Sequence, residues 1–229
     1  MGPSSFNLVA LPGLGFTEAL FAPLQEIGWD CEVLNWQEPQ PGEKLPAYAK
    51  RMGEDVLPPG GKLVLLGHSF GGILAQEISH FRKLESIILV SSVKKRTEIP
   101  WNLRAVAPLG LHHLFSRSFC LNTFPLWGPG FGYDTPASQS VFKEMVSRQT
   151  DTILQWSLRE LSRWRPPAPP ACPVFQVHGD RDKTFPYSRI KDANHSLPGG
   201  DHMMVFKQPA AFARILQTYL DTLSSSAAT

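Results

Sequence analysis

Short apolar runs alternate with amphipathic stretches along much of the chain. The run Phe6 to Leu11 precedes a segment, Thr17 to Gly28, in which apolar residues recur at helical spacing. This alternation is typical of βα units and predicts an α/β fold with a mostly parallel sheet of about six strands flanked by helices. The other strands expected are Cys31 to Trp36, Lys62 to Leu66, Ser86 to Val90, Val174 to Val177 and one near Ser196; the other helices expected are Tyr48 to Val56, Ile73 to Phe81 and Pro209 to Leu223.

The pattern changes between residues 94 and 171, which contain ten aromatic residues and no convincing strand. Helical spacing returns within this segment, at Val141 to Val146 and again at Ile153 to Leu161. We therefore expect residues 94–171 to form a helical lid or cap inserted into a core made of residues 1–93 and 172–229. The glycine-containing loop that starts at Pro12 comes too early for two preceding strands, so we expect no antiparallel hairpin at the N-terminus.

The sharpest motif is Gly67-His68-Ser69-Phe70-Gly71, between a buried strand and an amphipathic helix. A G-x-S-x-G motif in this context is typical of a nucleophile elbow, in which a cramped strand-to-helix turn exposes a serine. Glycines on both sides remove Cβ atoms that would collide with neighbouring backbone. The helix N-terminus also offers unpaired N–H groups to a developing oxyanion. Ser69 is therefore the candidate nucleophile.

The elbow, the loop Leu11-Pro12-Gly13-Leu14-Gly15 and the C-terminal motifs together resemble the α/β-hydrolase superfamily, and within it the small cofactor-free bacterial esterases. The resemblance covers essentially the whole chain and implies two backbone oxyanion donors, the N–H groups of Leu14 and Phe70. Pro12 replaces the histidine usual in that family. Since the donors are backbone groups, we expect the oxyanion hole to persist with a differently braced loop.

The same resemblance implies an acid after the strand Val174 to Val177, and two aspartates compete for this role. Asp182 has the family's distances both to the preceding Gly179 and to the following Pro186. Asp180 is the alternative, although a local turn residue that hydrogen-bonds the backbone explains it better.

The resemblance also implies a histidine before the last helix, and His202 in Gly199-Gly200-Asp201-His202 fits. The chain order Ser, Asp, His is that of α/β hydrolases. Three other histidines compete less well: we expect His195 at a strand end on the surface, His178 facing the sheet and His68 in a packing role. The short distance from Asp182 to His202 predicts a trimmed helix between the last two strands.

These residues suggest a serine hydrolase that cleaves a carboxylic ester through an acyl-enzyme, without a metal or an organic cofactor. The alternatives are a thioesterase or a lyase of the menaquinone-pathway kind with the same triad, or a non-catalytic ligand-binding protein of the same fold. The expected partner is a small-molecule acyl substrate. Some cap aromatics could line an acyl pocket, but we expect about two thirds merely to pack together: Trp101, Phe115, Phe119, Phe124, Trp127, Phe131, Tyr133, Phe142, Trp156 and Trp164.

Composition narrows the function classes further. The chain has 22 Lys and Arg against 20 Asp and Glu, so its charge is nearly balanced. We therefore do not expect a basic surface that binds nucleic acid or an anionic membrane. Cys31, Cys120 and Cys172 have no disulfide or zinc-site spacing, and the N-terminal residues do not resemble a signal peptide. A cytoplasmic protein is expected. The basic run Lys94 to Arg96 could attract an anionic substrate, although a solvated surface run explains it better.

Overall fold

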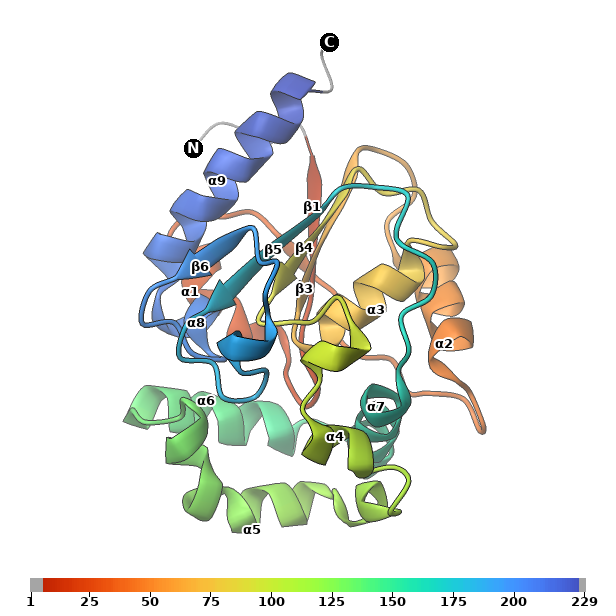
Figure 1. Cartoon of the computed structure of the whole chain (residues 1–229), viewed down its shortest axis with the longest axis vertical. Coiled ribbons are helices and arrows are strands. Elements are labelled where there is room, and N and C mark those ends of the chain that lie inside the picture. Colours follow the sequence, from red (N-terminus) through yellow and green to blue (C-terminus); the bar gives the residue numbers. More distant parts are fainter. Residues whose placement is uncertain (1–5, 227–229) are drawn as a thin grey trace.

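All six strands run parallel in the computed structural model, which describes residues 6–226 (Figure 1). The sheet order is β2-β1-β3-β4-β5-β6, so the predicted α/β fold with a six-stranded parallel sheet is confirmed. A strand pair before Phe6, which the sequence analysis does not expect, would lie outside the described residues. The strands are β1 (Asn7–Leu11), β2 (Glu32–Val33), β3 (Leu63–His68), β4 (Ser86–Val90), β5 (Val174–Gly179) and β6 (His195–Leu197).

Each central strand is apolar on both faces because the sheet is covered on both sides. In β1, Leu8 and Ala10 belong to one core cluster, whereas Val9 and Leu11 belong to the other. The first cluster lies against α1, α8 and α9 and the second against α2 and α3 (Figure 1). This explains why the strands are continuous apolar runs rather than alternating ones. The helices are α1 (Ala22–Glu26), α2 (Leu45–Arg51), α3 (Phe70–Ile78), α8 (Met204–Lys207) and α9 (Pro209–Ser226).

Three elements differ from the sequence prediction. The expected helix 17–28 is split into a 3₁₀ turn, Glu18–Leu20, and α1, with Pro23 in the first turn of the latter. A proline inside a continuous helix would clash with the carbonyl four residues earlier, so the helix restarts there. The strand expected over residues 31–36 is only two residues long, and α2 ends in a π-helical turn, Met52–Val56.

Between residues 94 and 171 the structure contains helices and no strand. In Figure 1 these helices lie beyond the carboxyl ends of the strands, on the side opposite the last turns of α9. Helix α7 also contacts α3 of the core. The division into core and cap stays a prediction. The helical elements of this segment are Arg96–Glu98, α4 (Trp101–Ala105), Leu111–Leu114, α5 (Arg117–Trp127), Gly128–Phe131, α6 (Pro136–Ser147) and α7 (Asp151–Arg163).

Aromatic side chains form much of the interior of this segment. Phe142 stacks on Phe124 with ring centroids 4.4 Å apart, and Tyr133 and Trp127 also contact its ring. Trp101, in contrast, is 69% exposed. Of the ten aromatics expected in the cap, five are buried, three of them in this cluster and two against the second core cluster: Phe124, Tyr133 and Phe142, and Trp156 and Trp164.

The basic run at residues 94–96 contacts two segments that are distant in sequence. Lys95 forms an ion pair with Asp192, and Lys94 Nζ donates to the Asp192 carbonyl at 2.6 Å. Arg96 donates to the carbonyl of Ser162, at the end of α7, at 3.1 Å. These side chains therefore bind neighbouring segments, whereas the side chains of a simple solvated run would contact mainly water. Within residues 6–226, no helix is both long and apolar enough to cross a membrane.

Candidate active site

Ser69 lies on a strained turn between β3 and α3. Its backbone has φ 53° and ψ −121°, in a region that residues with a Cβ rarely adopt. A Cβ at Gly71 would lie 2.2 Å from the carbonyl oxygen of Leu11, so only glycine allows α3 to approach the loop after β1. The turn is held on both sides of its strained residue: Ser69 N–H donates to Val90 O at 2.9 Å, and the Ser92 hydroxyl donates to Ser69 O at 2.6 Å.

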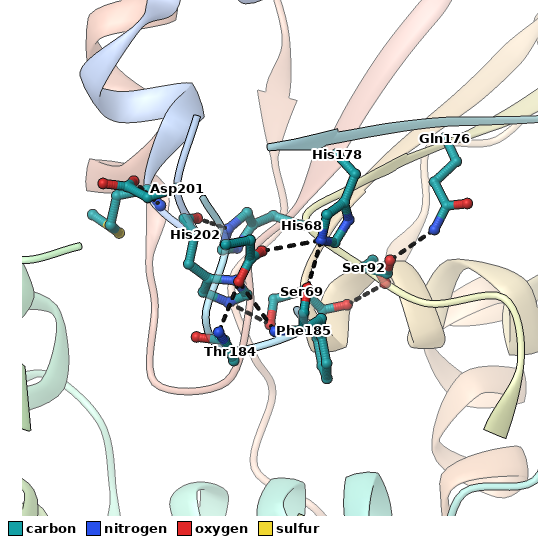
Figure 2. Close-up of polar contacts among 11 residues, drawn as sticks. His68, Ser69, Ser92, Gln176, His178, Thr184, Phe185, Asp201 and His202 are labelled. Carbon is teal, nitrogen blue, oxygen red and sulfur yellow. Dashed lines mark hydrogen bonds and ion pairs between the residues drawn. The ribbon is translucent and has the colours of Figure 1, made fainter. Parts of the chain in front are cut away.

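The three side chains predicted from sequence come together at the carboxyl edge of the sheet. Ser69 Oγ lies 3.0 Å from His202 Nε2, and His202 Nδ1 lies 2.9 Å from Asp182 Oδ2. Figure 2 shows His202 beside the Ser69 turn. All three residues are buried, and Ser69 retains 6% exposure. This geometry allows a proton to pass from Ser69 to an imidazole whose other nitrogen is held by a carboxylate.

Asp182 is held as an ionised acceptor. Its Oδ1 accepts the N–H groups of Thr184 and Phe185 at 2.8 and 3.0 Å, which leaves Oδ2 for His202. Burial by itself would raise the pKa of this carboxyl. The neighbouring His202 and His178, together with the backbone hydrogen bond from Phe185, outweigh burial and hold the pKa of Asp182 below its usual value.

Asp180 has a different role from Asp182. Its Oδ1 accepts the N–H of Gly199 at 2.8 Å, and Arg181 N–H donates to the Gly200 carbonyl at 2.8 Å. Asp180 therefore holds the loop before His202 rather than its own turn, which corrects the expected local hydrogen bond. The trimmed connection between β5 and β6 is present, since it contains only a 3₁₀ turn, Tyr187–Arg189.

His178 does not simply face the sheet, as expected from the sequence, but points at Asp182. Its Nε2 donates to Phe185 O at 2.8 Å and lies 3.4 Å from Asp182 Oδ2 (Figure 2). Burial lowers the pKa of His178, so the ring is neutral at pH 7. Period-two alternation in β5 gives a signal for this orientation, because it places His178 on the same face as Gln176.

His68 packs beneath the site and holds the backbone of His202. Its Nε2 donates to the carbonyl oxygen of His202 at 2.8 Å. Burial, followed by the nearby His202, lowers the pKa of His68 to about 3, so this ring stays neutral. The ring lies 5.3 Å from that of Phe16, which also contacts His202. The packing role expected for His68 thus includes a specific hydrogen bond, and His195 is exposed at the start of β6 as expected.

The two predicted oxyanion donors come from neighbouring segments. Phe70 is the first residue of α3, and the first N–H groups of a helix have no carbonyl partner within it. Leu14 follows Gly13 in the loop after β1, and a Cβ at Gly13 would lie 2.9 Å from Ser69 Cβ. Both donors therefore belong to backbone next to the candidate nucleophile.

Sequence reasoning did not find several residues around the site. Ser92 holds the carbonyl of Ser69, and Gln176 Nε2 in turn donates to the Ser92 carbonyl at 2.9 Å (Figure 2). Lys207 Nζ donates to Asp134 of the cap segment at 2.6 Å and to Asp201, the neighbour of His202, at 2.5 Å. The position of Ser92 just after β4, at the edge where parallel strands end, is a signal that could have found it.

Among residues 6–226 we find no group of three His, Cys, Asp or Glu side chains that could hold a metal ion. The three cysteines are unpaired thiols, and burial raises the pKa of Cys31 to about 11 and that of Cys120 to about 12. These thiols are therefore protonated at neutral pH and are poor nucleophiles.

The model of the alpha/beta hydrolase family matches residues 7–215 of the sequence. The chain belongs to the alpha/beta hydrolase family. The match spans the strands, the candidate site and the helical segment 94–171, as the resemblance noted from sequence implies. None of the curated proteins matches this sequence.

Solved structures of other alpha/beta hydrolases are similar to this one at low sequence identity. MenH from S. aureus has a TM-score of 0.73 at 13% identity, over 97% of this chain and 96% of that chain. A carboxylesterase of the ammonia-oxidizing thaumarchaeon Nitrososphaera gargenis has a TM-score of 0.69 at 17% identity, over 97% and 92%. The thioesterase RedJ of Streptomyces coelicolor has a TM-score of 0.58 at 17% identity, over 95% and 85%. At these identities the likeness shows the fold alone.

Proposed function

We propose that this alpha/beta hydrolase is a serine hydrolase that cleaves a carboxylic ester of a small-molecule acyl substrate through an acyl-enzyme. One observation carries the proposal: Ser69 Oγ, the two ring nitrogens of His202 and Asp182 Oδ2 form a continuous line of hydrogen-bond distances, 3.0 and 2.9 Å. A nucleophile, a base and an orienting acid in this geometry are the parts that acyl transfer needs.

The steps follow from the positions of these atoms. As Ser69 Oγ attacks the ester carbonyl, its proton passes to His202 Nε2, while Asp182 stabilises the imidazolium through Nδ1–H. The carbonyl oxygen becomes an oxyanion that the N–H groups of Leu14 and Phe70 stabilise. His202 then protonates the leaving alcohol, and a water molecule activated by the same histidine releases the acid product and restores Ser69.

The two neighbouring histidines favour this division of roles. Burial lowers the pKa of both His68 and His178, so neither adds a positive charge beside His202 at pH 7. Each donates its Nε2–H to a backbone carbonyl instead. Among residues 6–226, the proton from Ser69 therefore has one acceptor within hydrogen-bond distance, His202.

A fluorophosphonate probe tests the nucleophile. The wild-type protein should be labelled at Ser69, Ser69→Ala should not be labelled, and Ser188→Ala, which changes an exposed serine outside the proposed triad, should react like the wild type. Labelling of Ser69→Ala at the wild-type rate would overturn the proposal. Absence of labelling in the wild type would favour a non-catalytic ligand-binding protein.

A substrate panel then separates the chemistries that share this triad. Nitrophenyl esters and acyl-CoA thioesters of matched chain length should be compared by kcat/KM. The proposal expects faster turnover of the esters, whereas a clear preference for acyl-CoA would assign a thioesterase. Turnover of neither, with Ser69 still reactive to the probe, would point to a lyase of the menaquinone-pathway kind. A cytoplasmic location, deduced from the cysteine spacing, stays a prediction.

A further inference from the structure

Trp36 follows the short edge strand β2 and contacts the backbone beside Ser69. Its indole Nε1–H donates to the carbonyl oxygen of Gly13 at 3.0 Å, across 23 residues of sequence. Its ring also stacks on that of Phe70, with centroids 5.4 Å apart and planes inclined by 17°. A single side chain therefore contacts both segments that contain the predicted oxyanion donors.

The Gly13 carbonyl has a particular importance, because it belongs to the same peptide group as the N–H of Leu14. This group is planar, and in a trans peptide the C=O and N–H bonds point in opposite directions. The described residues contain no cis peptide bond. Holding the Gly13 oxygen on one side therefore sets the direction of the Leu14 N–H on the other.

Two donors hold this oxygen. Phe16 N–H closes the local turn on it at 3.0 Å, and the indole of Trp36 adds a second bond from a distant segment. A carbonyl that accepts hydrogen bonds withdraws electrons from its amide and makes the N–H of the same group a stronger donor. Trp36 would thus both orient the Leu14 N–H and strengthen it.

Trp36 is itself held firmly. The buried Tyr48 hydroxyl donates to the Gln37 carbonyl at 2.9 Å and accepts the Gln37 N–H at 3.0 Å, which fixes the chain next to Trp36. Leu34 N–H, on the other side, donates to Ala10 O on β1 at 3.0 Å. The indole is therefore fixed between two anchored neighbours, as a positioning group must be.

We infer that Trp36 is a positioning residue for the oxyanion hole, where its indole N–H orients the Gly13–Leu14 peptide toward the charge that develops on the substrate. The inference rests on the proposed function. It also gives a physical account of how the loop after Pro12 is braced, since the indole of Trp36 holds its Gly13 carbonyl.

The test uses variants that remove the indole N–H of Trp36 and keep an aromatic ring at this position. Trp36→Phe preserves an aromatic ring against Phe70, and Trp36→3-benzothienylalanine preserves the full indole shape without the N–H. Trp156→Phe is the matched control, because Trp156 Nε1 donates to another backbone carbonyl, Glu43 O, at 2.8 Å, and its ring also contacts Phe70. For each variant we would measure kcat and KM for 4-nitrophenyl butyrate, inhibition by butylboronic acid, and the free energy of unfolding.

Both Trp36 variants should lower kcat by about tenfold, less than the loss of about 10² or more when a donor is removed outright. KM should stay within about twofold, as expected for an interaction made in the transition state. Butylboronic acid, which forms a tetrahedral adduct with the serine, should bind more weakly by the same factor. Trp156→Phe should lose similar stability and keep wild-type kinetics and inhibition.

Wild-type kcat and boronic-acid affinity in both Trp36 variants would overturn the inference, as would equal losses in Trp156→Phe. A failure of the proposed function would look different. In that case the wild type would not hydrolyse the ester, or Ser69→Ala would hydrolyse it equally well, and the role of Trp36 would be overturned with it.

Discussion

Ser69 and His202 are 3.0 Å apart, yet they are held by opposite kinds of structure. Ser69 directly follows the central strand β3, where Val90 at the end of β4 accepts its N–H and Ser92 binds its carbonyl. Its positive φ costs about 1–3 kcal/mol, and this strained conformation persists only because the surrounding sheet holds the turn in place. The elbow is therefore a rigid part of the core.

His202 lies at the other extreme, in a loop between the edge strand β6 and the short helix α8. Side chains hold this loop: His68 binds the His202 carbonyl, Asp180 binds Gly199, and Lys207 binds Asp201. Substitutions at the elbow should therefore mainly lower the stability of the fold, whereas substitutions that affect the His202 loop should mainly lower the rate. Four predictions test this division.

The largest effect is expected at the acid. Asp182→Asn should lower kcat by about 10⁴ in a protein that remains folded, because an amide at this position favours the wrong tautomer of His202. Asp180→Asn is the control: because Asp180 only holds the His202 loop, this change should lower kcat no more than a few-fold and cost about 1 kcal/mol of stability. Kinetics and denaturation of both purified variants decide the assignment. A large rate loss confined to Asp180→Asn would reverse the roles of the two aspartates.

At the elbow, Gly71→Ala should cost stability first. The added Cβ would lie 2.2 Å from Leu11 O and 2.5 Å from Pro12 O, and both are backbone atoms that cannot move aside cheaply. We expect a loss of about 3 kcal/mol, at the upper end for overpacking. Urea denaturation measures it, with Gly130→Ala as the control, since a Cβ there meets nothing within 4 Å. Equal stability of the two variants would contradict this picture of the elbow.

The histidine that joins the two regions predicts a pH effect. The pKa of His68 falls from 6.5 to about 3 on folding, so below pH 6.5 the unfolded chain binds a proton that the folded protein does not. Stability should therefore be full above pH 6.5 and fall by about 1.4 kcal/mol per pH unit below it, down to about pH 3. Denaturation at several pH values should show a shallower slope in His68→Gln, which keeps a donor for the His202 carbonyl. An unchanged slope would show that His68 titrates normally.

The smallest effect is expected at the contact between the cap and the loop of His202. Lys207→Met removes the hydrogen bonds to Asp134 and Asp201 but keeps much of the side-chain volume. Because Asp134 is largely exposed, we expect a stability loss of only about 0.5 kcal/mol. The rate should fall a few-fold as the His202 loop loosens. Lys95→Met, which breaks the exposed pair with Asp192, should leave the rate unchanged, and an equal fall there would refute a specific role for Lys207.

Much of the site was predictable because it depends on short motifs and chain order. The Gly67 to Gly71 motif needs only its own strand, turn and helix, and the carboxyl ends of parallel strands bring distant segments to one edge of a sheet. The motif at Ser69, and the resemblance to α/β hydrolases for Asp182 and His202, predicted these three residues as neighbours, and the structure brings them together. The six parallel strands followed from the same alternation of apolar runs.

Other residues could not be found this way. Alternation in β5 indicates only the face on which His178 lies, and its contact with Asp182 depends on how β5 meets the turn after it. The contact of Trp36 with Gly13 spans 23 residues. The strand expected over residues 31–36 ends after Val33, so Trp36 leaves the edge of the sheet and turns toward the oxyanion loop. No local pattern encodes such a change of direction, because it results from packing against β1, α2 and α3.

By itself the sequence determined the local elements and the chemistry that they offer: the apolar strands, the glycines at the elbow, and the order of serine, aspartate and histidine. Hydrophobic periodicity and backbone sterics act over a few residues, so they can be read along the chain. Only the tertiary structure decided which polar groups hold these elements in place. Ser92, Lys207 and Trp36 act through hydrogen bonds between distant segments, and the partners of a buried donor are known only once the chain is folded around it.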